Sequence, residues 1–296
     1  MNRWERRNPR ADLVLRQEVL ELARAFAREE ARKGALAVLL AGSWARGDAR
    51  AGSDVDLWVL GKRSRHDFFS RDGHILSVAR RTVPGELRAL REPPYGGQAR
   101  AAWRYAITLW DPKGAARRVR TEALRPWDPA FRPKWDRYVA RSFVEWGEEV
   151  VKLTRAMGEG LPETAAVQRN LLVDALALLV AARDRLRYDQ NHLWELAGRR
   201  MGPDWHRLQL RALAAGGEGL EASCEAAVDL YFSTARAFRD LLTPNQREVV
   251  GLVARAAGRD PWDLPISRRA RRRPEGRRGR GASGGSSTAS RRARPG

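Results

Sequence analysis

Two aspartates, Asp54 and Asp56, stand one residue apart at the start of the apolar run Val55–Leu60. On a strand, residues i and i+2 project from the same face, where two unpaired carboxylates repel each other and lose hydration. A divalent cation removes both penalties, and hard oxygen ligands suit Mg²⁺, which also bridges phosphate oxygens. The pair therefore predicts a magnesium site at the mouth of a buried strand.

A second apolar run, Leu36–Ala41, ends in Gly42-Ser43, and ten residues separate Ser43 from Asp54. A strand that leads through a turn into a short helix directs backbone N–H groups at whatever lies above the turn, and glycine lets a phosphate approach the backbone. Phosphates held by this turn would meet a cation held by the two aspartates. The spacing predicts one site for a complex of Mg²⁺ with a nucleoside triphosphate.

Gly-Ser, a ten-residue gap and Asp-x-Asp between strands together resemble the hallmark of the nucleotidyltransferase superfamily. That superfamily includes DNA polymerase β, the aminoglycoside nucleotidyltransferases and the minimal nucleotidyltransferases. Ala45-Arg46-Gly47 and Ser53 also resemble the bacterial small-molecule and minimal branches. The resemblance is strong over residues 35–61 and loose over the rest of the first domain.

The resemblance implies a small mixed sheet with helices, on which Asp54 and Asp56 are catalytic and bind one or two Mg²⁺ ions. The residues that would bind the nucleotide are Gly42, Ser43, Arg46 and Ser53. An acceptor hydroxyl would attack the α-phosphorus of an NTP and release pyrophosphate, with catalysis by positioning and charge stabilisation. The expected cofactor is therefore Mg²⁺, and the expected co-substrate is an NTP.

Many members of the superfamily carry a third carboxylate on the next strand, which serves as a metal ligand or as the base for the acceptor hydroxyl. Here the strand expected at 74–83 has Ser77 near that position and no acid in His74–Ala79. Asp111, which precedes a short helix, is more typical of a helix cap than of a base. The base must therefore come from elsewhere, or activity is lost.

Three later acids are candidates for the acceptor site or the base: Glu145, Glu149 and Asp174. The two glutamates share one helix face at i and i+4, although a solvated face is the simpler interpretation. Asp174 interrupts the apolar helix 171–180, where a carboxylate needs a partner or a cleft. It would receive an acceptor group or, more commonly, a salt bridge from an arginine.

Apolar periodicity predicts the elements that carry these residues. We expect a helix at about 12–33, strands at 36–41, 55–60, 74–83 and 106–110, and helical periodicity throughout after Pro133. The expected helices are one long helix from Trp135 to Met157, two near 163–187 and 218–241, and a last one that begins with a capping box at Thr243. The predicted fold class is α+β. Its parts are a nucleotidyltransferase catalytic domain (1–122), an acceptor-binding helical bundle (123–262) and a disordered Arg/Gly/Ser-rich tail (263–296).

The net charge of +20 by itself indicates nucleic acid. Half of it lies in residues 267–296, which hold eleven arginines and one glutamate, so nucleic acid is expected at most as a partner of the tail and not as the main substrate. One cysteine, Cys224, excludes an internal disulfide and fits a reducing compartment. No secretion signal or membrane span is evident, and we expect a cytosolic protein.

The expected reaction transfers AMP to a hydroxyl of a small molecule, and an antibiotic-like aminocyclitol is one option. One alternative rests on Arg187 and His192, whose spacing resembles the motif of HEPN ribonucleases; those domains often partner minimal nucleotidyltransferases in toxin–antitoxin pairs that modify protein or RNA. A second alternative is a template-free RNA polymerase, and a third is a catalytically inactive nucleotide-binding protein, for which the missing third acid is the best support.

Overall fold

A five-stranded mixed sheet forms the first part of the computed structural model, which describes residues 9–260 and residue 262. Its strands are β1 (Ala37–Leu40), β2 (Val55–Leu60), β3 (Arg65–Arg71), β4 (His74–Arg81) and β5 (Ile107–Trp110). Their order is β3-β4-β2-β1-β5, in which β2 and β4 are parallel and every other neighbouring pair is antiparallel. The sheet with its helices, followed by a helical region, confirms the predicted α+β class.

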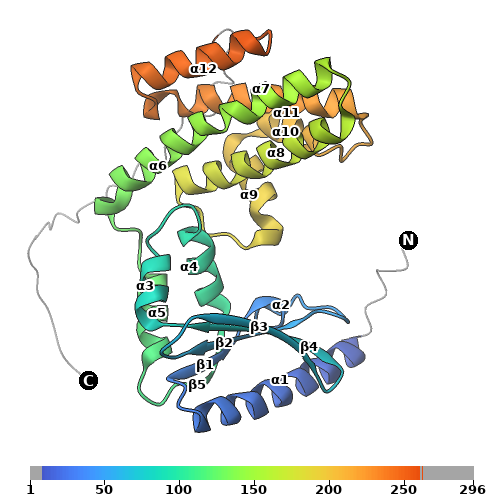
Figure 1. Cartoon of the computed structure of the whole chain (residues 1–296). Coiled ribbons are helices and arrows are strands. Elements are labelled where there is room, and N and C mark those ends of the chain that lie inside the picture. Colours follow the sequence, from blue (N-terminus) through green and yellow to red (C-terminus); the bar gives the residue numbers. More distant parts are fainter. Residues whose placement is uncertain (1–8, 261, 263–296) are drawn as a thin grey trace, which may run out of the picture.

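Helices cover both faces of this sheet (Figure 1). One face packs against α1 (Pro9–Arg32), and the other against α3 (Val83–Ala89), α4 (Gly96–Tyr105) and α5 (Ala115–Leu124). Since side chains alternate along a strand, Leu57 contributes to the α1 side, whereas Trp58 packs with Trp103 of α4 at a centroid distance of 5.3 Å. Asp56 therefore shares the face of the sheet that carries α3, α4 and α5.

The second part of the chain is helical, as predicted. Its helices are α6 (Arg132–Glu145), α7 (Gly147–Gly158), α8 (Pro162–Asp184), α9 (Leu193–Met201), α10 (Pro203–Ala212), α11 (Leu220–Phe238) and α12 (Pro244–Ala256), with 3₁₀ turns η1 (Pro129–Phe131), η2 (Gln190–His192) and η3 (Arg239–Leu241). Phe143 of α6 stacks on Tyr231 of α11 with ring centroids 4.6 Å apart. The capping box predicted at Thr243 is present, with Gln246 as its partner.

The helix predicted from Trp135 to Met157 is instead two helices, α6 and α7, which meet at Gly147. A Cβ on Gly147 would lie 2.9 Å from both the Tyr231 hydroxyl oxygen and a methyl of Val253. Glycine therefore permits the close approach of α11 and α12 that a continuous apolar stripe did not reveal.

The sequence analysis did not predict strand β3 or helices α3 and α4, and it predicted the region of α9 and α10 as helical without separating these two helices. β3 is mostly exposed and polar, so it lacks the alternating apolar signal of a half-buried strand. A hairpin signal was present, because Asp72 and Gly73 join β3 to β4 with φ angles of 50° and 76°, as type I′ turns require.

Helix α8 is long and apolar enough to cross a membrane by length and composition alone. Within the bundle, 56% of its most apolar window is buried, which is typical of the core helix of a bundle. The tail predicted for residues 263–296 lies outside the described residues, as does the start of the chain before residue 9.

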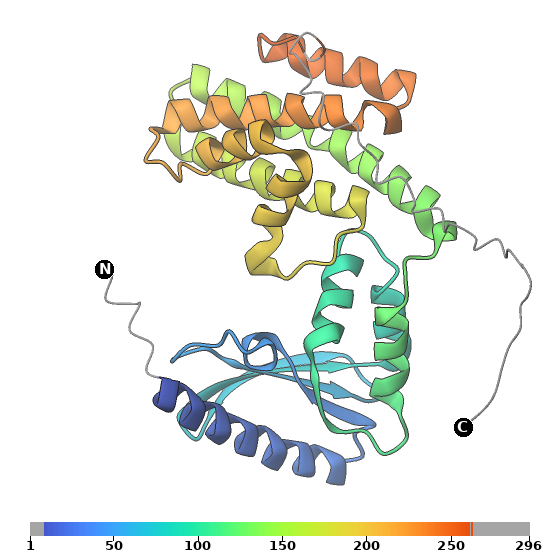
Figure 2. The same cartoon turned by 180° about the vertical axis from the view of Figure 1, so that it is seen from behind.

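The sheet region (residues 9–124) and the helical region (residues 129–260) lie side by side, as Figure 2 shows from behind, and direct contacts join these two regions and the segment between them. The Trp127 indole donates to the carbonyl of Arg185 at 2.8 Å, and the Trp135 indole donates to the carbonyl of Arg91 at 3.0 Å. A Cβ on Gly97 of α4 would clash with the carbonyl oxygen of Leu186. The backbone of α4 therefore packs tightly against the segment that follows α8.

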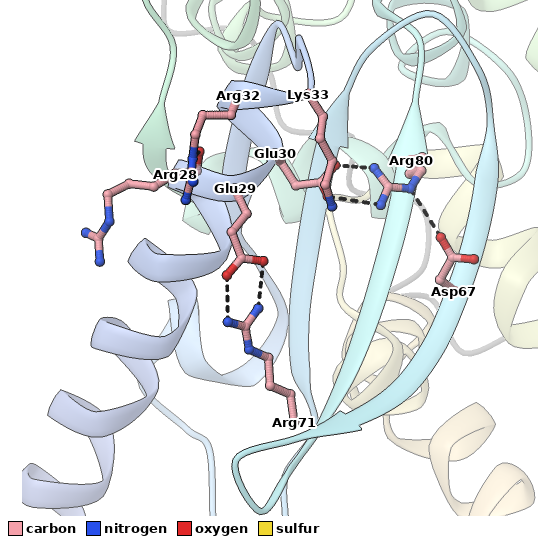
Figure 3. A network of polar contacts seen from close by, with 8 residues as sticks. All are labelled: Arg28, Glu29, Glu30, Arg32, Lys33, Asp67, Arg71 and Arg80. Atoms are coloured by element: carbon pink, nitrogen blue, oxygen red, sulfur yellow. Dashed lines mark hydrogen bonds and ion pairs between the residues drawn. The ribbon is translucent and has the colours of Figure 1, made fainter.

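A polar network ties α1 to the edge of the sheet (Figure 3). Glu30, only 2% exposed, pairs with Arg80 of β4 and with Lys33, and Arg80 also donates to Asp67 of β3 at 3.2 Å. Burial raises the pKa of Glu30, but the hydrogen bonds from Arg80 and Lys33 outweigh burial and hold the pKa below its ordinary value. The ion pair thus holds the edge strands to the helix that covers them.

Replacing Arg80 by Gln should lower the free energy of unfolding by about 2 kcal/mol at pH 7. A fully buried pair would lose roughly 3–5 kcal/mol, but Lys33 remains and Arg80 is partly exposed. Because the pKa of Glu30 is lowered in the folded state, its contribution is present above the unfolded pKa and disappears as the pH falls through the folded pKa.

Urea denaturation between pH 7 and pH 3 measures this difference. Arg28→Gln, on the exposed face of the same helix, is the matched control and should stay within 0.5 kcal/mol of the parent, by the usual size of surface effects, roughly ±0.5 kcal/mol. An Arg80→Gln effect no larger than that of Arg28→Gln would contradict the assigned role of the ion pair.

Candidate functional site

The carboxylate of Asp56 lies directly against the Cα of Gly42. Gly42 begins α2 (Gly42–Arg46) immediately after β1, with a φ of +61° in the left-handed region. A Cβ built there would lie 2.8 Å from the Asp56 Cγ and closer still to its Oδ2. Twelve residues separate Ser43 from Asp56 in the sequence. The glycine-serine turn and the second aspartate therefore meet in space.

Backbone donors are free at this turn. Among the described residues, the N–H groups of Gly42, Ser43 and Trp44 have no acceptor, and the Ser43 hydroxyl has no partner either. The first bonded amide is that of Ala45, which donates to the carbonyl of Ala41 at 3.3 Å. A set of N–H groups and a hydroxyl with nothing to bond can donate to phosphate oxygens.

Trp44 holds the turn and the loop before β2 together. Its side chain is 5% exposed, and its indole Nε1 donates to the carbonyl of Ser53 at 3.4 Å. The Ser53 hydroxyl accepts the amide of Arg50 at 2.9 Å. Ser53, predicted to bind the nucleotide, thus has an evident structural part, which is to fix the loop immediately before Asp54.

The two aspartates are poorly compensated by protein groups. The Asp54 carboxylate has no hydrogen bond or ion pair among the described residues, and Asp56 lies next to it. Burial, and then the charge of Asp54, raise the pKa of Asp56, whereas the hydrogen bond from Ser77 and the charges of Arg46 and His66 act in the opposite direction. Adjacent carboxylates held in this way fit a divalent cation.

Mg²⁺ suits this donor set. The described residues contain no group of three or more His, Cys, Asp or Glu that could hold a metal, so the protein offers two carboxylates. Mg²⁺ is usually bound by one or two carboxylates together with water and substrate phosphates. The free donors at Gly42 and Ser43 are where such phosphates would lie.

Ser77 occupies the β4 position beside Asp56, where the family resemblance led us to expect a third acid. It is the β4 residue paired in register with Asp56 of β2, it is 9% exposed, and it hydrogen-bonds the Asp56 carboxylate. Its Oγ also lies 3.1 Å from Nε2 of His66 on β3. His66 was missed at the sequence level because β3 itself was missed.

The three later acids have partners outside this site. Glu145 pairs with Arg141 at 3.5 Å, Glu149 pairs with Lys152 at 3.0 Å, and Asp174 is exposed and accepts the indole N–H of Trp194 at 3.2 Å. The salt bridge from an arginine that was expected for Asp174 is therefore wrong, because the helix turns this position to its surface. Asp111 caps α5 through its side chain, which accepts the amides of Ala116 and Arg117, although Gly114 and not Asp111 is the N-cap residue.

A cavity of about 420 Å³ lies between the two regions of the chain. Arg46 of α2 belongs to its lining, as do Arg187 and His192, the two residues of the ribonuclease-like motif. Glu145, Glu149 and Asp174 do not line it. The end of the short helix that begins at the predicted nucleotide-binding turn thus borders a space that residues of both regions line.

Comparison with known proteins matches part of the chain to a family model. Residues 20–115 match the family model of the nucleotidyltransferase domain, and this part of the chain is a nucleotidyltransferase domain. The chain is also similar to the crystal structure of a nucleotidyltransferase-like protein from Exiguobacterium sibiricum 255-15. The identity is 15%, 80% of each chain is covered, and the TM-score is 0.49. No curated protein matches the chain.

Gly42→Ala should displace the Asp56 carboxylate and weaken the binding of Mg–ATP by at least tenfold, about 1.4 kcal/mol. Gly52→Ala is the matched control, because Gly52 also has a left-handed φ, of +86°, but a Cβ there meets nothing within 4 Å. Both variants should lose roughly 1–2 kcal/mol of stability from backbone strain. Calorimetric titration with Mg–ATP compares the two variants. Equal affinities of Gly42→Ala and Gly52→Ala would show that the contact between Gly42 and Asp56 is unimportant for binding.

Asp56→Asn should raise the melting temperature of the metal-free protein at pH 7. Because the pKa of Asp56 is raised in the folded state, this carboxyl stabilises the protein most below its unfolded pKa and loses that contribution as the pH rises through the folded pKa. Removing the charge should recover on the order of 1 kcal/mol. The parent should gain further stability from Mg–ATP and the variant should not; thermal melts with and without ligand test both points.

Proposed function

We propose that this chain is a cytosolic, Mg²⁺-dependent nucleotidyltransferase that transfers AMP from ATP to a hydroxyl of a small molecule and releases pyrophosphate. The contact between the Asp56 carboxylate and Gly42 carries this proposal. It supports the proposal because the Asp56 carboxylate lies beside a turn whose amide donors are unbonded. The nucleotidyltransferase domain at residues 20–115 supports the reaction type.

Each part of the site has a defined task in this reaction. The N–H groups of Gly42, Ser43 and Trp44 and the Ser43 hydroxyl donate to the phosphate oxygens. Arg46, whose charge acts on Asp56, adds positive charge beside them. Asp54 and Asp56 hold the metal, and Mg²⁺ supplies charge neutralisation at the reacting phosphate when it is bound.

The chemistry that follows is an in-line displacement. The acceptor oxygen forms a bond to the α-phosphorus, the bond from that phosphorus to the bridging oxygen breaks, and pyrophosphate leaves with the bonding electron pair. The hydroxyl proton passes to water, since Ser77 stands where an acid would accept it and Glu145, Glu149 and Asp174 have other partners. Such a reaction depends mainly on positioning and on charge.

A second candidate is a nucleotide-binding protein that transfers nothing. Ser77 favours it, because the β4 position beside Asp56 carries a hydroxyl where many relatives have a carboxylate. The two candidates differ in one observable, since both bind Mg–NTP but only the first releases pyrophosphate.

Pyrophosphate release from each of the four NTPs, with Mg²⁺ and a panel of hydroxyl compounds, tests the proposal. ATP with one acceptor class should give turnover that falls at least 100-fold in the Asp54→Asn, Asp56→Asn double variant, as expected when both metal ligands are lost. Mass spectrometry should show an added AMP on the acceptor and none on the protein or on RNA. Turnover no greater than that of the double variant under every condition would leave the non-transferring candidate.

A further inference from the structure

The cavity between the two regions is enclosed by elements from far apart in the sequence. In both Figure 1 and Figure 2, α9 and the turn before it form the part of the helical region nearest to α2. The ionisable residues of the lining are Arg46, Asp48, Arg104, Arg187, Asp189, His192, Glu195 and Arg199. At about 420 Å³, the space falls in the range of small-ligand sites, roughly 300–1,000 Å³.

Positive charge is in excess in this cavity. Two of its arginines have carboxylate partners: Arg46 pairs with Asp48 at 3.2 Å, and Arg199 pairs with Glu195. Two others, Arg104 and Arg187, have no carboxylate partner in the described part of the chain. The third acid of the lining, Asp189, is engaged by His192 at 2.8 Å.

The two arginines without acidic partners are held differently. Arg104 lies over the ring of its neighbour Tyr105, with its guanidinium 5.7 Å from the ring centroid. Arg187 donates to the carbonyl of Arg125 at 2.7 Å, and carbonyls satisfy a guanidinium's donors without neutralising its charge. Guanidinium groups are well suited to bidentate binding of phosphate, so the cavity offers two such groups, one from each region.

The cavity also adjoins the nucleotide-binding turn. Arg46 is the last residue of the helix that begins at Gly42, it lines the cavity, and its charge acts on the Asp56 carboxylate. A phosphate in the cavity would therefore lie beside the predicted triphosphate site and on the helical side of it.

We propose that the interdomain cavity is a phosphate subsite, completed by Arg104 from the sheet region and Arg187 from the helical region. The proposal rests on the proposed nucleotidyltransferase function and narrows it, because a net positive cavity favours an anionic group and disfavours a cationic acceptor such as an aminocyclitol. The phosphate comes from one of two sources, the outer phosphates of the NTP or a phosphorylated small-molecule acceptor.

Binding of inorganic tripolyphosphate to the full-length protein tests the subsite directly. Calorimetric titration in 0.15 M salt should show affinity falling about tenfold in Arg104→Gln and in Arg187→Gln, the effect of losing one charge-assisted hydrogen bond. Arg141→Gln, which removes an exposed charge from α6, is the control and should change affinity less than twofold. The basic tail is common to all variants and cancels in the comparison.

Arg104→Gln is the decisive variant, since within residues 9–260 Arg104 makes only the ring contact with Tyr105, whereas Arg187 also ties the two regions together. Thermal melting should show both variants folded. If Arg104→Gln binds tripolyphosphate like Arg141→Gln, the proposal is overturned.

Two further titrations identify the source of the phosphate. If the NTP supplies it, both arginine variants should bind Mg–ATP about tenfold more weakly and bind AMP as the parent does. If the acceptor supplies it, Mg–ATP binding is unchanged, and in the presence of a non-hydrolysable ATP analogue ribose 5-phosphate should bind the parent better than ribose does, a preference that the variants lose. Either pattern supports the subsite.

The remaining outcomes decide against it. Preference of the parent for an aminocyclitol over ribose 5-phosphate overturns it when the arginine variants also bind Mg–ATP as the parent does, and so does RNA cleavage by the parent that His192→Ala abolishes. Failure of the proposed function is distinguishable, because these titrations need no turnover. If the arginine variants lose tripolyphosphate binding but the parent releases no pyrophosphate, the subsite is kept and the transferase is rejected. If the parent releases pyrophosphate but the variants bind tripolyphosphate unchanged, the transferase is kept and the subsite is rejected.

Discussion

One contact governs the candidate site: the Asp56 carboxylate occupies the space where any side chain at position 42 would project. Gly42 must also adopt a left-handed φ there, which glycine does without strain. Neighbouring elements of the sheet region bring Gly42 and Asp56 together. β1 delivers the turn, β2 delivers the aspartate, and Trp44 fastens the turn to the loop between them.

Much of this arrangement could be predicted from the sequence, because local signals and tertiary structure agree there. β2 was predicted with its observed bounds, and β1 and β5 within one residue, since each is an apolar run bounded by turn residues. The meeting of Gly42 and Asp56 followed from strand geometry and from a spacing that constrains several residue types at once. The roles assigned to Arg46, Ser53 and the aspartates remain predictions.

The rest depends on tertiary contacts that leave little local trace. His66 reaches Ser77 from an edge strand whose residues are mostly polar, and such strands lack apolar alternation. The break at Gly147 reflects the crossing of distant helices, which a continuous stripe of apolar residues conceals. Glu145, Glu149 and Asp174 were candidates by residue type and by their positions in the expected helices, and the bundle presents them to partners on its own surface.

The segment that joins the two regions is held by contacts from both of them. Arg100, 1% exposed, donates to the carbonyl of Arg125 at 2.9 Å, and Arg187 from the other region donates to the same oxygen. Trp127 covers the Arg100 guanidinium at 4.1 Å. Because both regions donate to the carbonyl oxygen of Arg125, the walls of the cavity between them are preorganised. A ligand that binds in this cavity therefore loses little entropy in bringing the two regions together.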